Sequence, residues 1–429
     1  LEDREYFGFN SIMGHDTTEL QERTEWKNNG SILNWLSKWN HEYDTHVSVS
    51  RYLYSSRYSS QQSTPVNGNH LSNIGSADED NTLEDRSIRF QHRYKGFENH
   101  RITSGIEESY YAVRYKTNKL DGSVSNTVVF NQEGFLHAFF LQDQWIPNDR
   151  WDVQAGYRVS YYNELEGFYG SPRLALKYRV RPGVSLETSL GRHHQFVRRL
   201  IGENMTRGTR RMWIISSRKI PCISSLNYHT GLNWEKGYYS LSMNGYYRSL
   251  NDIFQFQGSF IPTTTLVNNR TVSNNEIDFG TGTARGMELL LRKKEGMVSG
   301  WISYHLNRTK YDFPSLNNGD SFLANHDKMH EFKSVIMTRI RKWDFTATWV
   351  YASGRVYTSA ENIYVNSGYQ ISTTGNQNNK RLDSIHHLDV SISRTWQVSP
   401  AVIHTGLSIY NLYDQWNISH KRYNPYTTQ

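Results

Sequence analysis

Arginine side chains cluster around one tryptophan in the segment 198–219, which reads RRLIGENMTRGTRRMWIISSRK. A guanidinium group binds a carboxylate through two parallel hydrogen bonds, so this cluster could capture an anionic ligand, such as a chelate that carries carboxylates. The same composition would also suit contact with anionic lipopolysaccharide, or a loop that is merely solvated. The candidate ligand-binding residues are Arg198, Arg199, Arg207, Arg210, Arg211 and Trp213.

Acidic residues could support a second kind of chemistry. Two carboxylates that flank a glycosidic bond can hydrolyse it, and Asp143, Glu187, Glu288 and Asp389 lie in strand-like stretches. Nothing in the sequence brings two of these side chains together, and a wall that faces water needs charges in any case. We therefore expect no catalytic residue and no enzymatic activity.

Histidine and cysteine are the remaining groups that could hold a metal. Neighbouring residues of a strand point to opposite faces, so the adjacent pairs His193–His194 and His386–His387 cannot chelate a metal as they stand. Cys222 is the only cysteine, which excludes a disulfide within the chain and a cysteine-rich metal site. We expect no metal site and no cofactor.

The elements that must position these residues are strands with a two-residue period. In 150–162, RWDVQAGYRVSYY, apolar residues alternate with polar ones from Trp151 to Tyr161, which predicts a strand with one apolar and one polar face. Large aromatic residues begin and end these apolar rows, and an amphipathic ring is favoured at a membrane interface. The pattern recurs in 173–180, 184–191, 226–234, 239–247, 343–351 and 388–393. The candidate interface aromatics are Trp151, Tyr161, Trp234, Tyr247, Trp343 and Tyr351.

The composition limits the classes of protein. The 429 residues are 37% hydrophobic with a mean hydropathy of −0.72, and no apolar run approaches the ~18 residues of a membrane-spanning helix. The net charge of +7 is spread along polar strand faces and loops. Because there is neither a zinc-finger spacing nor a helical recognition pattern, we do not expect nucleic-acid binding.

The connections between strands alternate in length. The sequence predicts roughly 17 strands of about ten residues, the length of a transmembrane β-strand. Short turns alternate with long polar loops, which we expect at 60–84, 118–133, 201–220, 257–281, 314–328 and 359–384. This alternation is typical of outer-membrane barrels. The expected fold class is all-β, a transmembrane antiparallel up-and-down β-barrel, with a large soluble β protein as the alternative.

Five stretches of the chain resemble one family. They are AFFLQDQWIPNDRWDVQAGYRVSYY (138–162), GSPRLALKYRVRPGVSLETSLGRHHQ (170–195), ARGMELLLRKKEGMVSGWISYHLNRT (284–309), NHDKMHEFKSVIMTRIRKWDFTATWVYASGRVYT (325–358) and GLSIYNLYDQWN (406–417). In this order they resemble TonB-dependent outer-membrane transporters, especially those of Bacteroidota-type bacteria. The resemblance covers most of 134–418.

The resemblance implies a barrel of about 22 strands in the whole protein, closed by an N-terminal plug domain. We expect residues 1–429 to form a partial barrel of one domain, with the plug, the first strands and the last strand outside this chain. The implied location is the outer membrane of a Gram-negative bacterium.

The resemblance also implies a function. Outer loops would bind a scarce nutrient, which could be a siderophore or another iron chelate, cobalamin, a peptide or an oligosaccharide. The TonB–ExbB–ExbD motor would act through the plug and the TonB box, and the ligand would pass along the polar lumen. Further implied partners are membrane lipid, lipopolysaccharide and a surface lipoprotein lid. The alternatives are a passive diffusion porin of 16–18 strands and a soluble β-rich carbohydrate-binding protein.

Overall fold

A computed structural model describes the backbone of residues 2–13, 16–66, 70–121, 124–204, 208–257, 264–267, 270–273, 276–366 and 369–418. Strands dominate, and the two short 3₁₀ helices are η1 (Asn163–Leu165) and η2 (Asn317–Gly319). In the described part of the chain, no helix has the length and apolar character needed to span a membrane.

The main sheet has 18 strands, one of which is the two-residue β18 (Phe322–Leu323). The others are β1 (Glu2–Met13), β2 (Asp16–Lys38), β3 (Tyr43–Val66), β4 (His70–Tyr94), β5 (His100–Asp121), β6 (Val124–Asn148), β7 (Trp151–Tyr162), β8 (Gly167–Arg181), β9 (Val184–Gln195), β12 (Ile223–Lys236), β13 (Tyr239–Gln257), β16 (Glu276–Lys293), β17 (Val298–Asp312), β19 (His330–Ile340), β20 (Trp343–Ala352), β25 (Ile385–Val398) and β26 (Ala401–Ile409).

Small strands lie in the connections. They are β10 (Val197–Asn204), β11 (Gly208–Ile215), β14 (Thr264–Val267), β15 (Arg270–Ser273), β21 (Val356–Tyr357), β22 (Ala360–Asn366), β23 (Tyr369–Thr374) and β24 (Lys380–Arg381).

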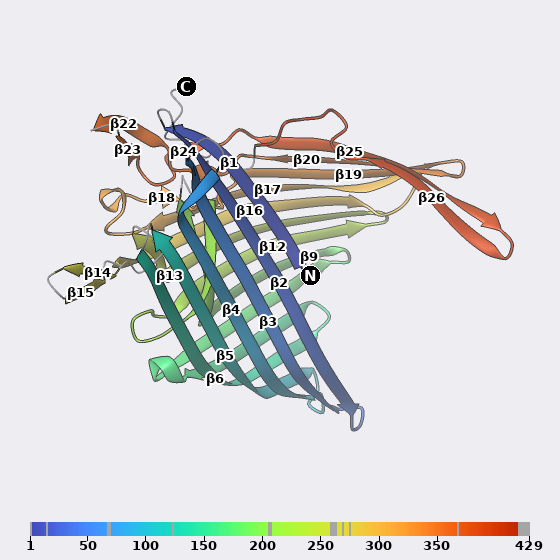
Figure 1. The fold of residues 1–429 in the computed structure, drawn as a ribbon. Helices are drawn as coiled ribbons and strands as arrows, with labels where there is room; N and C mark the ends of the chain where they lie inside the picture. Colours follow the sequence, from blue (N-terminus) through green and yellow to red (C-terminus); the bar gives the residue numbers. More distant parts are fainter. Residues whose placement is uncertain are drawn as a thin grey trace.

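Each long strand pairs antiparallel with the next long strand along the chain, from β1 to β26. The sheet curves, so that β2–β6 cross in front of β9, β12 and the later strands (Figure 1). Tight connections such as 149–150 and 341–342 lie at one end of the strands, which we call the short-turn end. The opposite, loop end carries the longer connections. The all-β antiparallel meander predicted from the sequence is therefore confirmed.

The strands β2–β6 are longer than the expected ten residues, with 23, 24, 25, 22 and 25 residues. Much of 60–84 and 118–133, expected as polar loops, belongs to these strands, so that expectation was wrong. The ladder continues beyond the apolar stretch because cross-strand ion pairs such as Arg57–Asp80, at 2.8 Å, suit a solvated strand pair. Hydrophobic alternation marks the apolar band and not the strand ends.

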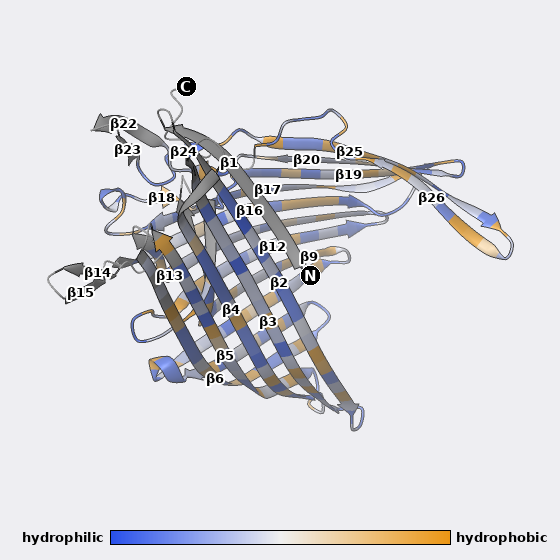
Figure 2. Cartoon of the chain, in the orientation of Figure 1, coloured by the Kyte–Doolittle hydropathy of each residue, from blue (hydrophilic) through white to orange (hydrophobic). Residues whose placement is uncertain are grey.

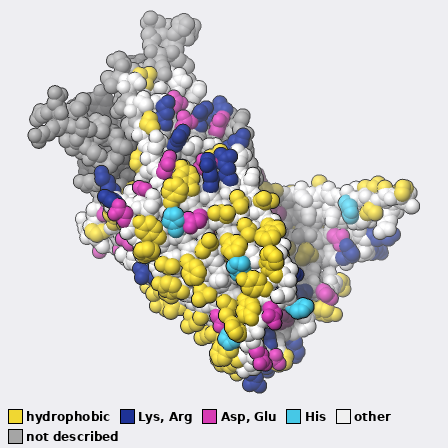
Figure 3. Space-filling view, turned by 90° about the horizontal axis from the view of Figure 1, so that it is seen from below, with side chains coloured by type: hydrophobic (Ala, Val, Ile, Leu, Met, Phe, Trp, Pro, Cys, Tyr) yellow, Lys and Arg dark blue, Asp and Glu magenta, His cyan; other side chains and the backbone are white. Residues whose placement is uncertain are grey.

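The register places the apolar rows of successive strands side by side. Trp151 lies opposite Tyr178, with ring centroids 4.5 Å apart, and Val153 lies opposite Leu176. We call the side that carries these residues the apolar face and the opposite side the polar face. Trp151 and Tyr157 are 40% and 54% exposed, so no second sheet covers them. Figure 2 shows the alternation along the strands, and Figure 3 shows apolar side chains gathered on one surface of the molecule.

The hairpin β10–β11 folds back across the polar face of β4–β6. The Trp213 amide donates to Asn81 Oδ1 at 2.9 Å, and the Ile215 amide donates to Gln132 Oε1 at 3.2 Å. Hydrophobic clusters fill the space beneath the hairpin, and burial of these side chains stabilises its position. One cluster joins Tyr54, Leu83, Val113 and Ile215, and another joins Leu136, Tyr162, Phe196 and Cys222.

The first prediction tests the two faces with neighbouring residues of β6. Leu141 lies opposite Tyr157 on the apolar face, and Gln142 lies opposite Gly156 on the polar face. We expect Leu141→Arg to lower the free energy of unfolding by about 2–4 kcal/mol, because an arginine at mid-bilayer must leave water. Gln142→Arg serves as the control and should cost less than about 1 kcal/mol. Equal losses, measured by denaturant unfolding in lipid vesicles, would contradict this assignment of faces.

The second prediction uses the single cysteine as a reporter of hairpin docking. Cys222 is 5% exposed, and burial raises the pKa of its thiol to about 11. We expect maleimide to label the folded protein at least about 100-fold more slowly than the unfolded one near neutral pH, because the thiolate is the reactive form. Phe196→Ala should speed labelling, whereas Val398→Ala, at an exposed site on β25, should not. Rapid labelling of the unmodified folded protein would show that the hairpin is not docked.

Candidate functional site: an arginine-lined hollow on the polar face

A hollow of about 710 Å³ lies on the polar face of β4–β9, next to the base of the β10–β11 hairpin. Its lining includes Phe196 and Val197 from the hairpin base. Charged side chains line it because every second residue of these strands points to the same side. These side chains are Asp85, Arg89, Arg93, Glu107, Arg158 and Arg173.

Arg158 and Glu107 form the central ion pair of the hollow. The Nη2–Oε1 and Nη1–Oε2 distances are 2.9 and 3.2 Å, and each side chain is 20% exposed. A bidentate pair of this kind has a fixed geometry. Arg89 lies 3.7 Å from the same carboxylate and 4.6 Å from the centroid of the Phe140 ring. Glu107 therefore orients two guanidinium groups.

Arg173 is the one arginine among the described residues of the hollow that has no carboxylate partner. It forms no ion pair with any carboxylate in the described part of the chain. Gly156 and Gly191 lie directly opposite Arg173 on the two neighbouring strands, so little side-chain bulk surrounds the guanidinium. Gly156 belongs to the family-resembling stretch 138–162, and Arg173 and Gly191 belong to the stretch 170–195.

The charges of the hollow do not balance. Four arginines and two carboxylates line it, and Arg93 also lies 3.6 Å from Asp44. A concave surface with an excess of one charge attracts ions of the opposite sign. The hollow is therefore suited to an anion, and Arg173 is the group with donors available for it. No histidine, cysteine or carboxylate group of three or more residues that could hold a metal occurs among the described residues.

The predicted binding segment 198–219 forms most of the hairpin. Within this segment, the guanidinium of Arg198 contacts other parts of the protein. Its Nη1 and Nη2 donate to the carbonyls of Asp252 and Pro221 at 3.0 and 2.8 Å, and its guanidinium lies 3.6 Å from the Phe254 ring centroid. Arg198 is buried. It therefore ties the hairpin base to the end of β13 and does not face a ligand.

Four other predicted residues of this segment, Arg199, Arg210, Arg211 and Trp213, lie farther along the hairpin than Arg198. Arg199 is exposed, 6.0 Å from the Trp213 ring, and Trp213 packs edge-on against Tyr54. Arg210 and Arg211 lie on β11, and their side chains are not described, while Arg207 lies outside the described residues. The structure thus assigns Arg198 to the base of the hairpin and Arg199 to its surface.

The six predicted interface aromatics share the apolar face. Next to the short turns, residues of the apolar rows on neighbouring strands lie opposite Trp151, Trp234 and Trp343. Their counterparts Tyr161, Tyr247 and Tyr351 lie on the same face toward the loop end. Their placement at the two membrane interfaces stays a prediction.

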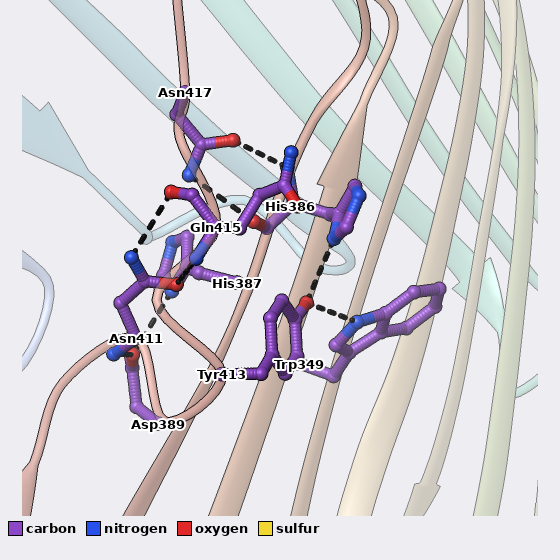
Figure 4. Close-up of polar contacts among 8 residues, drawn as sticks. All are labelled: Trp349, His386, His387, Asp389, Asn411, Tyr413, Gln415 and Asn417. Carbon is purple, nitrogen blue, oxygen red and sulfur yellow. Dashed lines mark hydrogen bonds and ion pairs between the residues drawn. The ribbon is translucent and has the colours of Figure 1, made fainter.

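The segment after β26 folds back on the start of β25 (Figure 4). The Asn417 side chain accepts from the His386 amide at 3.0 Å and donates to its carbonyl at 3.1 Å. The Tyr413 hydroxyl accepts from Trp349 Nε1 at 3.2 Å and lies 2.9 Å from His386 Nδ1. The resembling stretch 406–417 thus holds a chain reversal in place, and its polar groups satisfy one another.

Sequence reasoning missed Arg89, Glu107, Arg158 and Arg173 as a group. Arg158 and Glu107 are 51 residues apart, so no local pattern indicates their pairing. A usable signal existed nonetheless, because each of the four occupies a polar-face position of an alternating strand. Counting the charged residues on each face of the strands, and not within each segment of the sequence, would have revealed the excess of arginines over carboxylates.

Comparison with known proteins agrees with this architecture. A family model described as "TonB dependent receptor-like, beta-barrel" matches residues 2–412. A search of curated proteins finds no relative. Among solved structures, the siderophore receptor PirA from Acinetobacter baumannii has a TM-score of 0.53 at 10% identity, covering 96% of this chain and 74% of that one.

Two further solved structures have the same fold. The outer-membrane transporter YddB from Escherichia coli has a TM-score of 0.56 at 10% identity, covering 96% of this chain and 72% of that one. The ferripyoverdine receptor of the Pseudomonas aeruginosa outer membrane, bound to ferripyoverdine, has a TM-score of 0.57 at 9% identity, with coverages of 96% and 66%. These neighbours give no support to the narrower Bacteroidota-type resemblance.

The family match decides between the classes considered from the sequence. It favours neither the diffusion porin nor the soluble carbohydrate-binding protein. Members of the matched family are transporters of the Gram-negative outer membrane and not enzymes, which confirms the expected location and the expected lack of enzymatic activity. The chain belongs to the TonB-dependent receptor family and forms β-barrel wall of such a receptor.

Proposed function

We propose that this receptor imports an anionic nutrient, of the ferric-siderophore class, along the polar face of its barrel. The observation that carries the proposal is the excess of guanidinium groups in the hollow, with Arg173 left without a carboxylate. The neighbouring structures support the class, since one is a siderophore receptor and another holds ferripyoverdine. An uncharged oligosaccharide would gain nothing from this charge.

The uptake route follows from the two ends of the sheet. Loops at the loop end face the outside, and the hairpin residues Arg199, Arg207, Arg210, Arg211 and Trp213 would make the first contact with the ligand. Guanidinium groups bind carboxylate or catecholate oxygens through charge-assisted hydrogen bonds. The ligand would then move down to the hollow, where Arg173 replaces part of its lost hydration.

Energy for this movement would come from the TonB–ExbB–ExbD motor. In this proposal residues 1–429 supply part of the barrel, and a plug domain with a TonB box lies elsewhere in the protein. The plug would rearrange and open the passage past the polar face. The six interface aromatics would hold the barrel at the correct depth, since amphipathic rings prefer the headgroup level.

The third prediction concerns Arg173. We expect Arg173→Gln to weaken uptake of the anionic ferric siderophore at limiting concentration by about ten-fold or more, because a hydrogen bond to a charged group contributes about 1.5–3 kcal/mol. Arg192→Gln is the matched control, because Arg192 lies opposite Leu226 on the apolar face of the adjacent strand β9. Uptake of radioactive iron by whole cells, scored at equal receptor amounts, provides the measurement.

The ligand class is tested with a receptor-deletion strain grown on single iron sources. Growth should be restored by the full receptor on a carboxylate- or catecholate-type ferric siderophore, and a TonB deletion should abolish that growth. Growth restored only on an uncharged oligosaccharide would refute the proposed ligand class. Solute entry that persists without TonB would point to passive diffusion.

A further inference from the structure

An arginine on the apolar face lies between two tryptophans at the short-turn end. The Arg394 guanidinium carbon is 3.6 Å from the Trp396 ring centroid and 5.3 Å from the Trp343 ring centroid. Arg394 lies directly opposite Trp343 in the β20–β25 register. The short connections at 341–342 and 399–400 are close by in the chain. This is the end of the sheet that faces the periplasm in outer-membrane barrels.

The two indole rings form a fixed corner around the guanidinium. Their centroids are 6.4 Å apart with an interplanar angle of 84°. Trp396 Nε1 donates to Thr405 Oγ1 at 3.0 Å, which sets the orientation of this ring. A guanidinium stacked on an aromatic face keeps its N–H groups in the plane, free to donate at its edge. The corner therefore positions the charge without using its donors.

Arg394 differs from two arginines of the apolar face that have carboxylate partners. Arg51 and Arg57, toward the loop end, lie 2.7 and 2.8 Å from the carboxylates of Glu84 and Asp80. Arg394 forms no hydrogen bond or ion pair through its guanidinium in the described part of the chain, and its Nε is shielded from solvent. A guanidinium that stacks on aromatic rings and receives no acceptor from the protein can donate its terminal N–H groups to an anionic partner outside the protein.

The neighbours of the corner indicate what that partner is. Phe345 and Leu407 are exposed on the same face, between the corner and the middle of the apolar band, and Ile403 is exposed directly opposite Trp396. A free anion would leave these apolar side chains uncovered. A phospholipid would place its acyl chains on them and its phosphate at the guanidinium, with the tryptophans at the headgroup level.

We propose that Arg394, Trp343 and Trp396 form a binding site for the phosphate of a phospholipid in the periplasmic leaflet. Arg394 donates from its terminal amino groups to two phosphate oxygens, in the bidentate geometry that suits arginine. The tryptophans hold the guanidinium and contact the glycerol region. This site is independent of the imported ligand, so failure of the proposed function would not affect it.

The experiment is native mass spectrometry of the delipidated full-length receptor, titrated with phosphatidylglycerol in detergent. We expect one phospholipid to be retained well above the background of weak adducts, and Arg394→Gln to weaken its affinity by about ten-fold or more. Trp396→Leu should weaken it several-fold through loss of the stacking surface. Arg192→Gln is the control and should leave the affinity unchanged. Arg192 lies on the same face, near the loop end of β9, whereas the corner lies at the short-turn end.

One further variant, a folding check and one competitor make the outcome decisive. Arg394→Lys retains the charge but loses the bidentate donor geometry of the guanidinium. Its affinity for the phospholipid should lie between those of the wild type and Arg394→Gln. Heat-modifiable migration in gels verifies that each variant folds. Equal phospholipid retention in wild type and Arg394→Gln would overturn the proposal. Displacement of the lipid by equimolar inorganic phosphate would also overturn it, because the site would then recognise a free anion.

Discussion

The hydrogen-bond ladder of the sheet is the constraint on which every other feature depends. Backbone N–H and C=O groups in lipid find no water, so strands can cross a membrane only if neighbouring strands satisfy them. The antiparallel pairing from β1 to β26 meets this requirement for the described strands, apart from the outer edges of β1 and β26, which pair with no other described strand. Because a ladder fixes alternate side chains on opposite sides, it also separates the lipid-facing chemistry from the ligand-facing chemistry.

The side chains on the two faces of the sheet pack in different ways. On the apolar face the side chains of neighbouring strands contact one another and remain exposed for acyl chains. On the polar face, hydrophobic clusters form where the β10–β11 hairpin covers the sheet, above β4–β6. The hollow lies beside this covered region, so a rigid wall and a docked hairpin together hold its arginines. Arg198 contributes by bonding two carbonyl groups at the hairpin base.

The alternation of apolar and polar residues predicted the structural features that depend on residues close together in the sequence. The alternation in 150–162 predicted both the strand and its exposed face, because Trp151, Val153 and Tyr157 interact mainly with lipid and with adjacent strands. The lengths of β3–β6 could not be predicted in this way, since ladder pairing outside the apolar band requires no hydrophobic period. The family resemblance in 284–358 depended on several hairpins in order, and the family match bears it out. The narrower lineage had no comparable support.

The roles of individual charges depend on contacts that the sequence does not show. Arg198 reads as a ligand-binding residue in the segment 198–219, yet its acceptors include the carbonyl of Asp252, 54 residues away. Arg158 and Glu107 pair across two intervening ladders for the same reason. Arg394 is likewise ordinary in sequence, and only the register that brings Trp343 beside it distinguishes the corner.

Spin-label accessibility along β7 is the most direct test of the two-faced wall. Single nitroxide labels would be placed from residue 151 to 162 in the full receptor in bilayers, with Cys222 replaced by serine. Oxygen, which concentrates in lipid, should relax labels at 153, 155, 157 and 159 more strongly than those at 154, 156, 158 and 160, and a water-soluble nickel complex should show the inverse pattern. Protection of the 153, 155, 157 and 159 positions from both reagents would place the apolar face inside a protein core and contradict the membrane-spanning arrangement.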